Sequence, residues 1–156
     1  MRKIPKISDL KMRMIEETFK DFKCLLVRYR EVKGDEILLK EFCSRNRNPL
    51  FDITQINYFK TGLRSKGLIE NGGDFTHEHF IPRVKSVEII FGELDRNPDM
   101  NVETFIFLIK KYVSTILLTK DEHKRITSLT RGTGVMNYLV YERAGIEVPG
   151  LEEYIL

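Results

Sequence analysis

The chain has 156 residues, of which 42% are hydrophobic and 31% are charged, and this composition excludes an intrinsically disordered protein because enough apolar side chains are present to build a core. The formal net charge of +3 permits nucleic-acid binding without requiring it. Two cysteines are too few for a zinc site made of two CxxC pairs, and no apolar run reaches the ~18 residues of a membrane span. We therefore expect a cytoplasmic protein with no membrane partner.

The first part of the sequence predicts helices, because apolar residues recur there at intervals of three and four positions. Helices are expected over residues 8–32, 36–45 and 53–66. Ser8 and Asp52 are the residues expected to cap the first and the third of these helices. Residues 1–70 are therefore predicted to form a helical module.

The second part of the sequence, residues 71–156, mixes strand and helix patterns. A short β-hairpin is expected, in which residues 68–70 and 75–80 flank the turn sequence NGGD. Helices over residues 83–94 and 102–112, a strand over 115–118, a helix from Lys120, a loop over 132–134 and a helix over 135–144 follow. The predicted fold is α+β and mostly helical, with a short hairpin and one further short strand.

Residues 35–80 are predicted to run helix, turn, helix and hairpin. Within them, YFKTGLRSKGLIE at residues 58–70 resembles the end of a winged-helix recognition helix and its step into the first wing strand. The resemblance implies a helix in the major groove of DNA, in which amide side chains read base edges and cations hold phosphates. The nucleic-acid-binding residues would be Gln55, Asn57, Lys60, Arg64 and Lys66. A packing or protein-docking role for this module is the alternative.

All three histidines lie in two short segments, THEHF at residues 76–80 and TKDEH at residues 119–123. Histidine suits general-base catalysis because its pKa lies near neutral pH. A hydrolytic metal site needs few protein ligands, because water and substrate phosphate complete the coordination. The two segments are therefore candidates for catalytic or metal-binding roles, and histidines with no site role are the alternative.

The segment EHFIPR at residues 78–83 resembles the first half of the motif of HNH endonucleases, a His-metal finger family. The segment STILLTKDEH at residues 114–123 resembles its second half, with Ser114 at the position of the usual asparagine. This resemblance implies a divalent cation, Mg²⁺ being expected, held by Glu78 and His123, and it implies that His79 is the general base. Supporting contacts to these residues or to the substrate would come from His77, Arg83 and Ser114.

The leading hypothesis from the sequence is therefore a metal-dependent endonuclease that hydrolyses phosphodiester bonds in duplex DNA. Residues 71–156 would be an HNH-like finger with a helical insertion and a C-terminal helix, and small phage-encoded proteins are the relatives that the resemblance suggests. The alternatives are a finger that has lost catalysis, a winged-helix transcription regulator, and a modulator that binds a host enzyme. The relative positions of Glu78, His79 and His123 distinguish these hypotheses.

Overall fold

The computed structural model describes residues 6–56, 59–79, 81–130 and 138–155, and the chain divides into two compact units. The helical unit comprises Met1–Phe59 and Arg83–Val113, and the sheet unit comprises Lys60–Pro82 and Ser114–Leu156. Each unit combines two separate stretches of the chain, whereas the sequence led us to expect consecutive modules. Within the described residues, no helix is long and apolar enough to cross a membrane.

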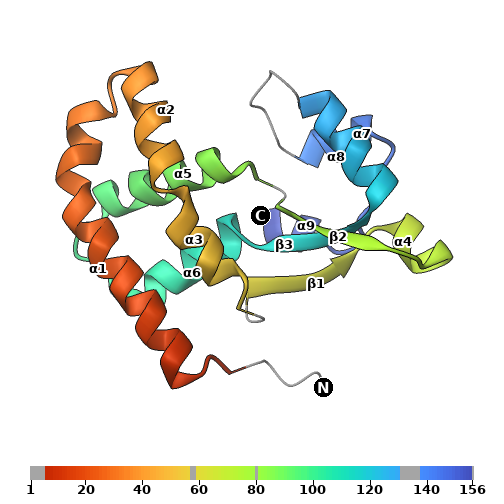
Figure 1. Ribbon diagram of the computed structural model, residues 1–156, viewed down its shortest axis with the longest axis horizontal. Helices are drawn as coiled ribbons and strands as arrows, with labels where there is room; N and C mark the ends of the chain where they lie inside the picture. Colours follow the sequence, from red (N-terminus) through yellow and green to blue (C-terminus); the bar gives the residue numbers. More distant parts are fainter. Residues whose placement is uncertain (1–5, 57–58, 80, 131–137, 156) are drawn as a thin grey trace. The chain divides into compact units, whose positions relative to one another are not determined.

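The helical unit contains α1 (Asp9–Val32), the longest helix among the described residues, together with further helices (Figure 1). The further helices are α2 (Glu36–Arg45), α3 (Arg47–Thr54), α5 (Arg83–Arg96) and α6 (Val102–Tyr112). Side chains before three of them accept hydrogen bonds from otherwise unpaired backbone amides: Ser8 caps α1, Asp35 caps α2 and Asn101 caps α6. The cap predicted at Ser8 is therefore confirmed.

Aromatic rings fill the centre of the helical unit. Phe91 of α5 stacks on Phe22 of α1 with ring centroids 4.5 Å apart, and on Tyr29 at 5.5 Å. Phe42 of α2 meets Phe91 edge-on at 4.9 Å. Such ring pairs contribute about 0.5–1.5 kcal/mol beyond the burial of their apolar area. The ring of Phe91 thus joins α5 to both α1 and α2.

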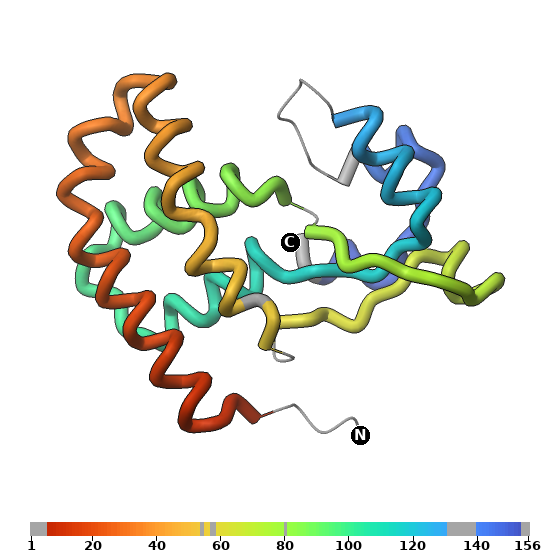
Figure 2. The backbone as a smooth tube through the Cα atoms, in the orientation of Figure 1, coloured from red at the N-terminus to blue at the C-terminus, as the bar shows by residue number. Residues whose placement is uncertain are grey.

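The sheet unit is built around three short strands, β1 (Lys60–Arg64), β2 (Phe75–His79) and β3 (Thr115–Thr119). Their order is β1-β3-β2, with β1 parallel and β2 antiparallel to β3. Figure 2 shows the path by which the last strand in sequence enters between the first two. β2 is consequently an outer strand of this sheet.

Helices α7 (Lys120–Thr130) and α8 (Tyr138–Arg143) complete the sheet unit together with α4 (Lys66–Asn71) and α9 (Glu152–Ile155). α7 follows β3 without an intervening loop and packs on β2 and β3. The second hydrophobic core includes Ile116 and Leu118 of β3, Ile126 of α7 and Tyr141 of α8. One face of the sheet is therefore covered by α7 and α8.

The predicted α+β, mostly helical fold is confirmed, and β2 and β3 lie where strands were expected, whereas β1 does not. Residues 68–70, expected as a strand, belong to α4, because the Ser65 hydroxyl accepts a hydrogen bond from Leu68 N at 3.1 Å and starts a helix there. β2 therefore pairs with β3, and the expected hairpin is not formed. The prediction of a helix over residues 53–66 is also wrong, since α3 ends at Thr54 and β1 begins at Lys60.

Candidate functional site

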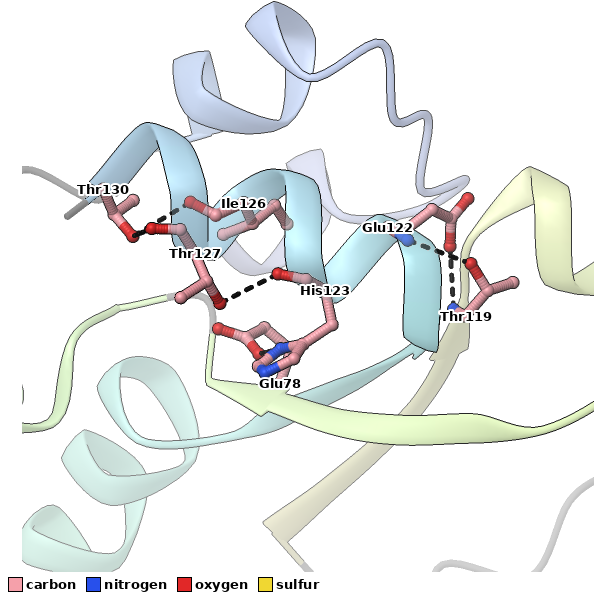
Figure 3. A network of polar contacts seen from close by, with 7 residues as sticks. All are labelled: Glu78, Thr119, Glu122, His123, Ile126, Thr127 and Thr130. Carbon is pink, nitrogen blue, oxygen red and sulfur yellow. Dashed lines mark hydrogen bonds and ion pairs between the residues drawn. The ribbon is translucent and has the colours of Figure 1, made fainter.

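Strand β2 and helix α7 bring Glu78 and His123 into direct contact (Figure 3). The Glu78 carboxylate meets Nδ1 of the His123 ring, although the two residues are 45 positions apart in the sequence. The side chain of Glu78 is 13% exposed and that of His123 is 43% exposed. The pair is thus partly buried, and the imidazole remains accessible to a small ligand.

The position of His123 follows from the way α7 begins. Thr119 Oγ1 accepts a hydrogen bond from Glu122 N at 3.2 Å, and the Glu122 carboxylate accepts one from Thr119 N at 2.8 Å. This reciprocal pair is a capping box, which fixes the first turn of a helix. In Figure 3, Glu122 turns back to Thr119, whereas His123 points toward β2. The spacing T-x-x-E of this capping box is visible in the sequence at residues 119–122.

Glu122 also connects α7 to α4. Its carboxylate is buried and accepts a hydrogen bond from Ser65 Oγ at 2.6 Å. A Cβ atom at Gly67 would lie only 2.6 Å from Glu122 Oε1, so a side chain at this position would push against the carboxylate. The Glu122 carboxylate already accepts hydrogen bonds from Ser65 and Thr119. Glu122 therefore has a structural role and does not join Glu78 and His123 as a further candidate ligand.

Side chains alternate along β2, so Glu78 and His79 point to opposite faces of the sheet. Glu78 lies opposite Ile116, which belongs to the core covered by α7, whereas His79 lies opposite Thr115. His77 shares the face of His79, and burial, followed by the charge of Lys60, lowers the pKa of His77. A cation held by Glu78 and His123 would therefore not have His79 as a ligand.

The other residues of the predicted site have definite places. Ser114 is buried just before β3, in the sheet unit. Arg83 is the first residue of α5 in the helical unit, where its guanidinium lies 4.2 Å from the centroid of the Phe51 ring. Among the described residues, no group of three or more histidine, cysteine, aspartate and glutamate side chains is arranged to hold a metal ion. Any cation would rest on the two side chains of Glu78 and His123.

The five residues expected on one DNA-facing helix are spread over different elements. Gln55 is exposed and follows α3, and Asn57 lies outside the described residues. Lys60 and Arg64 belong to β1. Lys66 begins α4, where its Nζ lies 3.3 Å from a carboxylate oxygen of Glu147. A single recognition helix is not formed, because a strand occupies the second half of the expected helix.

An open groove beside α7 is lined by cations that the sequence analysis did not single out. Lys124, Arg125 and Arg143 line it together with Ser128, Leu129 and Ala144, and none of these lining residues is acidic. Arg125 Nη1 donates a hydrogen bond to the Ala144 carbonyl oxygen at 2.6 Å, which fixes the guanidinium at the groove. The sequence HKR at residues 123–125 was the available signal, since two cations directly follow the candidate ligand.

In comparisons with known proteins, no family model, no curated protein and no solved structure matches this chain. A functional interpretation consequently depends on the residues of the site and on their geometry. The feature that stands out is a carboxylate and an imidazole that meet at the junction of an antiparallel strand pair and a helix.

Proposed function

We propose that this chain is a metal-dependent endonuclease of the HNH type, which hydrolyses phosphodiester bonds. The observation that supports the proposal is the contact between Glu78 and His123. These residues were assigned as the two metal ligands from separate halves of the motif, and two antiparallel strands followed by a helix bring them together despite two intervening helices.

The donor set fits a divalent cation. A carboxylate and an imidazole supply one oxygen and one nitrogen ligand, and the accessible His123 ring leaves room for water and phosphate to complete the coordination. Glu78 and His123 would hold the cation, with Mg²⁺ expected. When bound, such a cation polarises the scissile phosphate and offsets the charge that develops on its oxygens.

His79 would act as the general base that removes a proton from the attacking water. It follows Glu78 directly but points to the other face of β2, which is an outer strand. In an in-line displacement the attacking water and the leaving oxygen lie on opposite sides of phosphorus, so the base and the cation would act on a bound phosphodiester from different sides. Because His79 Nε2 is buried, this role requires that substrate binding uncovers the ring.

The surroundings of the pair favour a phosphate-containing polymer as the substrate. Lys124, Arg125 and Arg143 line one groove without a carboxylate, on the helix that carries His123 and on its neighbour α8. Several adjacent cations hold a nucleic-acid backbone through its phosphates, independently of sequence. Duplex DNA is the expected partner.

The test is nicking of supercoiled plasmid DNA by the full chain with Mg²⁺ or Mn²⁺. We expect His79→Ala to slow nicking by about 10²–10⁴-fold, which is the usual contribution of a general base, while duplex binding stays unchanged. Glu78→Gln should slow nicking and should also raise the concentration of divalent cation that nicking requires. Glu103→Gln, a change at an exposed carboxylate of α6, is the matched control and should cleave at the wild-type rate.

Two results would reject catalysis. Duplex binding without cleavage by any divalent cation would favour a non-catalytic DNA-binding protein, and loss of binding in Lys124→Ala with Arg143→Ala would then locate that surface. Absence of both cleavage and binding, together with a stable complex with a defined host enzyme, would favour a protein-binding modulator.

A further inference from the structure

Tyr141 stands out among the buried polar side chains of the sheet unit. It belongs to α8 and is 2% exposed, and among the described residues its hydroxyl has no hydrogen-bond partner. A buried hydroxyl without a partner is unfavourable, since it has lost its contacts with water. Such groups are rare in proteins, and each one calls for an explanation.

The place of Tyr141 in the core connects it with Glu78. Tyr141 packs in the same hydrophobic cluster as Ile116 of β3. Ile116 is the direct cross-strand partner of Glu78, and directly paired residues project from the same face of a sheet. The phenol and the carboxylate therefore lie on the same side of the sheet, under the cover of α7 and α8.

The electrostatics of the phenol agree with this placement. Burial, and then the negative charge of Glu78, raise the pKa of Tyr141. The phenol consequently stays protonated at neutral pH and is a hydrogen-bond donor. A carboxylate is the acceptor that such a donor needs.

A cation between Glu78 and His123 would replace their present contact, because both ligand atoms would turn to the metal. Carboxylates that bind metals are usually held in orientation by hydrogen bonds from neighbouring groups. We propose that the Tyr141 hydroxyl is this neighbouring group, and that it donates a hydrogen bond to the Glu78 carboxylate when a divalent cation is bound. Tyr141 is thus a positioning residue, and this inference depends on the metal site of the proposed function.

The experiment is calorimetric titration of the full chain with Mn²⁺ alone. Tyr141→Phe removes only the hydroxyl, and we expect it to weaken Mn²⁺ binding by about 10–100-fold, as is usual for residues that orient metal ligands. The metal-free variant should melt no earlier than the wild type, because the change removes a buried polar atom without a partner. Tyr29→Phe, at a buried tyrosine of the helical unit, should bind Mn²⁺ like the wild type.

A second readout follows the wild-type protein itself. Addition of Mn²⁺ should change the tyrosine absorbance when the phenol begins to donate a hydrogen bond, and this change should be absent in Tyr141→Phe. Equal Mn²⁺ affinity of wild type and Tyr141→Phe would overturn the inference while leaving the proposed metal site intact. If Glu78→Gln also leaves the affinity unchanged, the proposed site fails and the inference fails with it.

Discussion

Different interactions stabilise the interior of each of the two units. The helical unit has a continuous interior in which Phe91 contacts the rings of Phe22, Tyr29 and Phe42. The sheet unit has a smaller core and, in addition, a buried carboxylate, Glu122, which joins the starts of two helices. The candidate site belongs to the unit that depends on directional polar contacts. Hydrogen bonds define the orientation of a side chain such as His123 more narrowly than apolar packing does. The loss of a single donor or acceptor atom is enough to break them.

The largest expected effect tests the aromatic interior. Phe91→Ala should lower the free energy of unfolding by about 3–5 kcal/mol, because it removes a fully buried ring and leaves a cavity. Urea unfolding followed by circular dichroism measures this loss. The control is Phe107→Ala, at a phenylalanine of α6 that is 61% exposed, which should change stability by no more than about 0.5 kcal/mol. Similar losses in both variants would contradict a closed aromatic core.

The second effect tests the polar connection in the sheet unit. Glu122→Ala leaves Ser65 Oγ and Thr119 N without their acceptor, and it should cost about 1–3 kcal/mol. Amide hydrogen exchange should show faster exchange at the beginnings of α4 and α7 while the helical unit is unchanged. Asp121→Ala, at an exposed carboxylate of the same turn, is the control. Uniform acceleration over both units would mean that Glu122 does not act locally.

A smaller effect distinguishes the two thiols of the helical unit. Cys43 is 1% exposed, and burial, followed by the charge of Glu88, raises its pKa to about 12. Cys24 is exposed. A thiol-specific reagent at neutral pH should therefore modify Cys24 alone in the native protein and both cysteines after denaturation. Modification of both thiols at one rate in the native protein would show that the interior opens readily.

The smallest effect is a pH dependence in the sheet unit. The pKa of His77 is lowered in the folded state. As the pH falls through the ordinary pKa of histidine, the unfolded chain therefore binds more protons than the folded chain. The contribution of His77 to stability is therefore complete above that value and is lost on acidification. Comparing urea midpoints between about pH 5 and 8 should show a shallower dependence in His77→Gln than in the wild type. An identical pH dependence in both proteins would exclude His77 as its source.

Several parts of this molecule follow from local sequence patterns. The amphipathic spacing and the Ser8 cap of α1 identified that helix, because both signals lie within the helix itself or beside it. The same is true of α6 and of β3, whose boundaries agree with the expected ones within one residue. The pairing of Glu78 with His123 was anticipated from two motif halves and not from any periodicity.

The parts that escaped prediction depend on distant partners. β1 contains Gly62 at φ 72° and two cations, and it is a strand because β3 pairs with it. The burial of Tyr141 and of Glu122 likewise follows from the packing of α7 and α8 on the sheet. No window of neighbouring residues contains that information, since the atoms that cover these groups come from elsewhere in the chain.

The order of the strands determines when the sheet can form during synthesis of the chain. β1 and β2 each pair with β3, which is the last of the three to leave the ribosome. Until residues 115–119 have been synthesised, neither earlier strand has its partner. The chain between each earlier strand and β3 then loses conformational entropy before the pairing contributes to stability. Glu78 and His123 can thus meet only after the segments of the helical unit have been made. The candidate site therefore cannot form in a nascent chain that ends before His123.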